Sequence, residues 1–155
     1  MAIYELRNDN YQRNSRTGVG ANSMTTVAGR FFVSSAANII SKATSTSRIV
    51  GVNYTQKAYA ADNQTVAKAL VEYEPFETDI SYQVAITGGT VTIADQGNFF
   101  NLSSTTGDVV DGTTTTATPY TANAAAAGVT PVVSVQLQLV RFISATLGEF
   151  KIVNL

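Results

Sequence analysis

Residues 79–87 read DISYQVAIT, and this short alternating stretch decides the fold class. The apolar residues at every second position are Ile80, Tyr82, Val84 and Ile86. Successive side chains of a β-strand point to opposite faces, so a period of two indicates a strand with one buried face. Gly88 and Gly89 follow, and they predict a turn into a second strand through Val91 and Ile93.

The C-terminal stretch SVQLQLVRFISATLGEFKIVNL, residues 134–155, predicts a β-hairpin. Its first strand is expected to bury Val133, Val135, Leu137 and Leu139 and to leave Ser134, Gln136 and Gln138 on the other face. The apolar parity changes at Val140, which favours a β-bulge or a strand that passes from one sheet to another. Gly148 suits a three- or four-residue loop, after which Phe150 and Ile152 return to the core.

Three further segments have strand character. VAGRFFVS (27–34) and SRIVGVNY (47–54) are rich in β-branched and aromatic residues. TVAKALVEY (65–73) fits a helix through Val66, Leu70 and Tyr73 and a strand through Ala67, Ala69, Val71 and Tyr73, and Pro75 ends either version. We prefer the strand because it places Lys68, Glu72 and Glu74 together on a solvent face.

Short strands separated by Gly, Asn, Asp and Thr predict an all-β fold, a small single-domain barrel or sandwich with an extended N-terminal arm. Residues 1–25 form the expected arm, because they are polar and Asn-rich and lack a core-forming period. Residues 26–155 form the expected β domain, with a long Thr/Ala-rich loop at about 103–130. Loops of this length are usually either functional or disordered.

The composition excludes several kinds of chemistry. The chain of 155 residues has no His and no Cys, which excludes His/Cys zinc sites, Cys nucleophiles, disulfides and Ser-His-Asp triads. It has no apolar run long enough for a signal peptide or a membrane span, so we expect a protein soluble in a cytoplasm.

Charge is distributed unevenly along the chain. Residues 1–68 contain eight basic and three acidic side chains, a net charge of +5, and residues 69–140 have a net charge of −7. We expect the two halves to neutralise each other within the fold, although the basic half also suits an acidic surface on another chain. With 10 basic and 11 acidic residues in all, nucleic-acid binding is not expected.

The sequence gives little support for a catalytic or metal-binding site. Glu72 and Glu74 on one strand face would be about 6 to 7 Å apart, near the spacing of glycosidase carboxylates, but an exposed acidic face explains them better. Asp95, Asp108 and Asp111 suit either a Ca²⁺ site or ordinary turns, and we favour turns. The GVG at 18–20 lacks the third glycine of a phosphate-binding loop. We therefore expect no enzyme activity, no catalytic residues, no metal and no cofactor.

Five segments in order carry a family resemblance: DNQTVAKALVEYEP (62–75), YQVAITGG (82–89), IADQGNFFNLS (93–103), VVDG (109–112) and QLQLVRFISATLGEFKIV (136–153). They resemble the small capsid decoration proteins, also called cement or auxiliary head proteins, of tailed bacteriophages. The similarity covers roughly residues 47–154 and rests on the pattern and order of these segments.

The resemblance implies an all-β structural protein that is made in the host cytoplasm and assembles, often as a homotrimer, on the exterior of the virion head. Its implied partners are the major capsid protein and other copies of itself, with no nucleic acid, membrane or small-molecule substrate. The arm is the expected binding element, through Ile3, Tyr4, Leu6, Arg7, Tyr11, Arg13 and Arg16. Ile3 to Leu6 is expected to add as a strand to a sheet edge of the capsid or of a neighbouring subunit.

A receptor- or glycan-binding module of a phage fibre or tail is the alternative. Direct glycan binding, and a position at the tail instead of over the head, would distinguish it.

Overall fold

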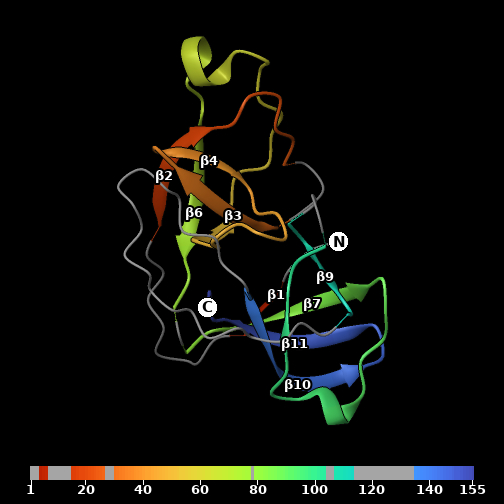
Figure 1. Cartoon of the computed structure of the whole chain (residues 1–155). Helices are drawn as coiled ribbons and strands as arrows, with labels where there is room; N and C mark the ends of the chain where they lie inside the picture. The colour runs from red at the N-terminus through yellow and green to blue at the C-terminus, as the bar shows by residue number, and fades with distance from the viewer. Residues whose placement is uncertain (1–3, 7–14, 27–29, 78, 104–106, 114–134) are drawn as a thin grey trace, which may run out of the picture.

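The structure is a computed structural model, and it describes residues 4–6, 15–26, 30–77, 79–103, 107–113 and 135–155. These residues form a closed five-stranded barrel and a second, six-stranded sheet (Figure 1). The described helical segments are two short turns, η1 (Asn63–Ala67) and η2 (Ile93–Asp95). The predicted all-β fold with a barrel is therefore confirmed.

The barrel is built from strands β2 (Arg16–Gly20), β4 (Ile39–Lys42), β3 (Phe32–Ala36), β5 (Gly51–Asn53) and β6 (Leu70–Pro75), in that spatial order. The β2–β4 pair is parallel and the other pairs are antiparallel. Ala37 and Asn38 join β3 to β4 with φ angles of 50° and 65°, the left-handed backbone that two-residue hairpins prefer. The barrel interior is filled by Met24, Phe31, Val33, Ile40, Tyr59, Val71 and Tyr73.

Residues 15–25, which we expected to belong to the arm, are part of the barrel. Strand β2 pairs with β4 and β6, and Met24 is only 7% exposed. The sequence hides this strand because Gly18 and Gly20 stand where apolar side chains would reveal it. An added Cβ would lie 2.6 Å from Ile40 at Gly18 and 2.5 Å from the Tyr59 ring at Gly20. The two glycines are thus packing residues, and the predicted arm cannot extend beyond Ser15.

The second sheet has the order β1 (Tyr4–Leu6), β7 (Ser81–Thr87), β11 (Leu147–Ile152), β10 (Leu137–Ser144) and β8 (Phe99–Phe100), and β9 (Val109–Asp111) also pairs with β7. The four apolar residues of DISYQVAIT are all at most 5% exposed, which confirms the predicted buried face. Strand β9 lies inside the segment that we expected to be a long loop. Residues 104–106 and 114–130 of that segment lie outside the described residues.

The barrel and the sheet share a second apolar cluster. Phe32, Ala43, Ile49 and Val52 of the barrel side pack with the inward residues of the sheet, among them Tyr82 and Phe150. The Phe32 and Tyr82 rings meet edge to face, with centroids 5.3 Å apart. Successive residues at the start of β3 therefore serve two cores, because Phe31, just before β3, and Val33 pack in the barrel cluster while Phe32 packs in the cluster shared with the sheet.

Gln136, which we expected on the face opposite the apolar residues, is fully buried between the two layers. Its Nε2 donates to the carbonyls of Thr44 (2.6 Å) and Ser47 (2.5 Å), and its Oε1 accepts from the Leu102 amide (2.8 Å). The side-chain amide thus bonds backbone groups of two segments, the turn at residues 44–47 and the chain at Leu102. This is the physical reason why a polar residue is buried here.

The predicted C-terminal hairpin is present, with a different turn. The register of β10 against β11 shifts between Leu139 and Arg141, which confirms the bulge expected at Val140. Ser144 pairs with Leu147, so the loop has only two residues, and Gly148 lies inside β11 instead of in the loop. A Cβ at Gly148 would lie 2.7 Å from the Leu139 side chain, which explains the glycine. Phe150 and Ile152 are buried, as predicted.

Two local predictions need correction. The chain does not form a second strand after Gly88 and Gly89. It enters η2, where Asp95 accepts hydrogen bonds from the Thr92 amide (2.8 Å) and hydroxyl (3.0 Å), and Ile93 is 69% exposed.

The ambiguous segment 65–73 divides between the two interpretations. Its first residues lie in η1, and its last residues lie in β6, which buries Val71 and Tyr73 as a strand would. The expected solvent face is wrong at Glu74, which is 2% exposed and accepts a hydrogen bond from the Tyr54 hydroxyl.

Candidate functional site

The structure places part of the predicted arm on a sheet edge of its own chain. Tyr4, Glu5 and Leu6 pair antiparallel with Gln83, Tyr82 and Ser81 of β7. Arg16 is the first residue of β2, where it is exposed and lies opposite Tyr73. The other predicted arm residues, Ile3, Arg7, Tyr11 and Arg13, lie outside the described residues.

The outer edge of β7 is shared between two strands. β11 pairs with residues 82–85 along one edge of β7. β1 pairs with residues 81–83, and β9 pairs in parallel with residues 85–87. Both strands must use the opposite edge of β7, because β11 already occupies the first edge. The strand that the sequence indicates best is therefore also the strand to which the arm is added.

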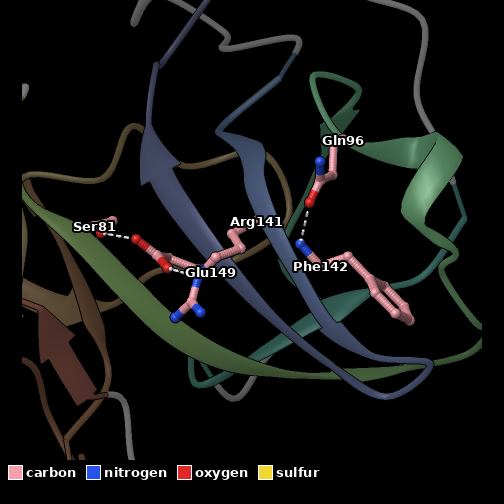
Figure 2. A network of polar contacts seen from close by, with 5 residues as sticks. All are labelled: Ser81, Gln96, Arg141, Phe142 and Glu149. Atoms are coloured by element: carbon pink, nitrogen blue, oxygen red, sulfur yellow. Dashed lines mark hydrogen bonds and ion pairs between the residues drawn. The ribbon is translucent and has the colours of Figure 1, made fainter.

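A polar network lies on the sheet beside this edge (Figure 2). Glu149 of β11 accepts a hydrogen bond from Ser81 Oγ (2.5 Å) and one from Arg141 Nε (2.7 Å). Burial opposes ionisation of Glu149, but the hydrogen bonds from Ser81 and Arg141 and the Arg141 charge outweigh it and hold the Glu149 pKa below its usual value. The network joins β7, β11 and β10 across one face, so the acceptor strand is held in place without β1.

Gln96 holds the bulged strand on its other side. Its Oε1 accepts a hydrogen bond from the Phe142 amide (2.8 Å), as Figure 2 shows. Gly97 donates its amide to the Leu139 carbonyl (2.8 Å), and Asn98 accepts from the Leu139 amide (3.0 Å) through its carbonyl. The edge of β10 is thus covered by its own chain, where a long free edge would invite unwanted strand pairing.

The end of the barrel carries exposed apolar side chains that the sequence did not single out. Val66 in η1 is 72% exposed, and Leu70 at the start of β6 is 49% exposed. Figure 1 shows η1 as the yellow-green turn that projects beyond the barrel. The buried Asn63 anchors this turn, because its Nδ2 donates to the Gly20 carbonyl (2.7 Å) and its Oδ1 accepts from the Ala69 amide (2.9 Å). The apolar residues therefore stand on a fixed turn.

The acidic residues considered for chemistry are not brought together. Glu72 is exposed and Glu74 is buried, so the two carboxylates are not both open to a substrate as a glycosidase pair would be. Asp95 caps η2, and Asp111 Oδ1 accepts from the Thr113 amide (2.9 Å) in a local turn. Within the described ranges, no three acidic side chains lie close enough to hold a metal ion.

Comparison of the sequence with known protein families and with curated proteins found no match. Neither of the two helical turns in the described part of the chain is long and apolar enough to cross a membrane.

Proposed function

We propose that this chain is a structural protein of a bacteriophage virion that binds the outside of the head and strengthens the contacts between capsomers. The observation that carries the proposal is the pairing of Tyr4–Leu6 with the edge of β7. An N-terminal segment that forms a strand on a sheet edge is the element expected of a protein that fastens neighbours by strand addition.

The body of the protein suits this role. The barrel closes on itself and therefore leaves no free edge, and the outer edge of β10 pairs with residues 97–100. Among the described strands, β1 and β8 end the second sheet, and we assign strand addition to the side of β7 that carries β1. The proposal includes a homotrimer and the major capsid protein as partners, and it assigns the chain no catalytic residue, cofactor or small-molecule substrate.

Affinity is expected to come from many weak contacts. A three-residue strand supplies only a few main-chain hydrogen bonds, each with a net contribution of about 0.5 to 1.5 kcal/mol. The Arg residues of the arm, and the exposed Arg16, add attraction to an acidic surface. Copies joined in a trimer bind several sites at once, which multiplies the apparent affinity.

Deletion of residues 2–14 tests the proposal, because this truncation stops before Arg16 and leaves the barrel intact. The truncated protein is expected to keep the circular dichroism spectrum of the full chain and to lose most of its binding to purified phage heads that lack the protein. Full-length protein with Val66→Ser is the matched control, since this change also alters an exposed site but leaves the arm in place.

Electron microscopy of virions provides the second measurement, with density expected at regular positions over the whole shell. Unchanged head binding after the truncation would remove the arm from the mechanism. Density at the tail instead, together with glycan binding by the isolated protein, would replace the proposal by a receptor-binding role.

A further inference from the structure

The two strands on the outer edge of β7 are attached very differently. β9 is held from both sides, because Gly112 donates to the Thr87 carbonyl (2.7 Å) while Ser103 donates to Val109 (2.8 Å) and Asp111 donates to Asn101 (2.9 Å). β1 pairs with β7 alone among the described strands. Among the described strands, β1 can therefore be removed without breaking any pair between other strands.

We propose that, in the assembled oligomer, strand Tyr4–Leu6 of one copy occupies the Ser81–Gln83 edge of the next copy. This inference rests on the self-association included in the proposed function, and it identifies both the donor strand and the acceptor edge. The occupant is a second copy of this chain, because its strand makes the same pairs in either arrangement: Tyr4 with Gln83, Glu5 with Tyr82 and Leu6 with Ser81.

The connection along the chain permits the exchange. Residues 7–15 separate β1 from β2, and nine residues span up to about 30 Å when extended. β2 belongs to the barrel and β7 to the other sheet, so no short hairpin fixes β1 to its own body. Exchange of an identical element preserves its contacts and changes mainly the entropy of the connection, which makes it a low-cost route to oligomers.

The acceptor edge is ready before the strand arrives. Ser81 Oγ is bonded to Glu149, and Tyr82 is fully packed in the shared core, with 1% exposure. Donation from each copy to the next is a head-to-tail contact, and such contacts form a ring when the rotation between copies closes, as it does in a trimer with three-fold symmetry. In a ring of three copies each Ser81–Gln83 edge is occupied by a strand of a neighbouring copy.

Cysteine cross-linking tests the exchange, and the natural chain contains no Cys that would interfere. Opposed residues of antiparallel strands have Cβ atoms about 4.5 to 5.5 Å apart, close to disulfide geometry. A Tyr4→Cys protein is mixed with a Gln83→Cys protein, refolded together and oxidised. The expected product is a covalent dimer that contains one chain of each kind, seen on a non-reducing gel and by mass spectrometry.

A Tyr4→Cys protein mixed with a Thr87→Cys protein is the control, since Thr87 lies four residues further along β7, about 13 Å away. It is expected to give no covalent dimer. A Tyr4→Cys/Gln83→Cys double variant that forms only intrachain disulfides, at concentrations where sedimentation shows an oligomer, would overturn the exchange. That result would leave the proposed function standing, whereas failure to bind heads would remove the function whatever the cross-linking shows.

Discussion

Replacing Gln136 with leucine is expected to lower the free energy of unfolding by about 3 kcal/mol, because leucine has a similar volume but no amide. The buried Leu102 amide loses its acceptor, which costs about 1 to 3 kcal/mol. The half-buried carbonyls of Thr44 and Ser47 each lose the hydrogen bond from Gln136, at about 0.5 to 1.5 kcal/mol each, although Thr44 still accepts from the Ser47 amide. The added apolar burial of leucine offsets about 1 kcal/mol of this cost.

Urea unfolding followed by circular dichroism measures the effect. With a slope of about 2 kcal/mol per molar urea, the midpoint is expected to fall by about 1 to 2 M. Gln138→Leu is the matched control two residues away, because Gln138 donates to Gly97 (2.9 Å) at an exposed site and its loss is expected to cost under about 1 kcal/mol. Equal midpoints for both variants and the natural protein would refute the reasoning that Gln136 joins the barrel to the sheet.

Three further predictions follow from packing and charge. Gly51→Ala is expected to abolish soluble expression or to lower the thermal midpoint sharply, since the new Cβ would lie 2.0 Å from a β6 carbonyl oxygen. Gly97→Ala is the control, because its Cβ would meet no atom within 4 Å, and it is expected to cost only about 1 kcal/mol for its left-handed backbone. Because folding lowers the pKa of Glu149 below its reference of 4.5, the carboxylate stabilises the fold above that pH and loses this contribution as the pH falls through the folded-state pKa. Urea unfolding of Glu149→Gln and natural protein should therefore differ at pH 6, the difference should shrink as the pH is lowered below 4.5, and a constant difference would contradict the assignment. Val71→Ala, at a fully buried site, is expected to lower the free energy of unfolding by about 2 kcal/mol in the same urea assay. Val66→Ala, at a 72% exposed site, is expected to lower it by less than about 0.5 kcal/mol. A larger loss for Val66→Ala than for Val71→Ala would contradict the strand at Val71.

The candidate site was predictable only in part. The N-terminal residues stand out because they are polar and lack a core-forming period, and Tyr4–Leu6 does form a strand on an edge. The identity of that edge was not predictable, because Ser81–Gln83 is far away in the sequence and main-chain pairing leaves no signature in side chains. The exposed turn at Val66 was missed because its pattern is also compatible with a regular strand.

The sequence by itself determined the strands whose apolar period is local: β7, the bulged β10 and the returning β11. Alternation reports which face of a strand is buried, and a change of parity reports a bulge, without reference to any other segment. The tertiary structure alone decided the closure of the barrel, the burial of Gln136 and Glu74, and the need for glycine at positions 20 and 148. These depend on what other segments bring against each residue, since a buried amide needs distant backbone partners and a glycine is required only where another side chain already fills the space.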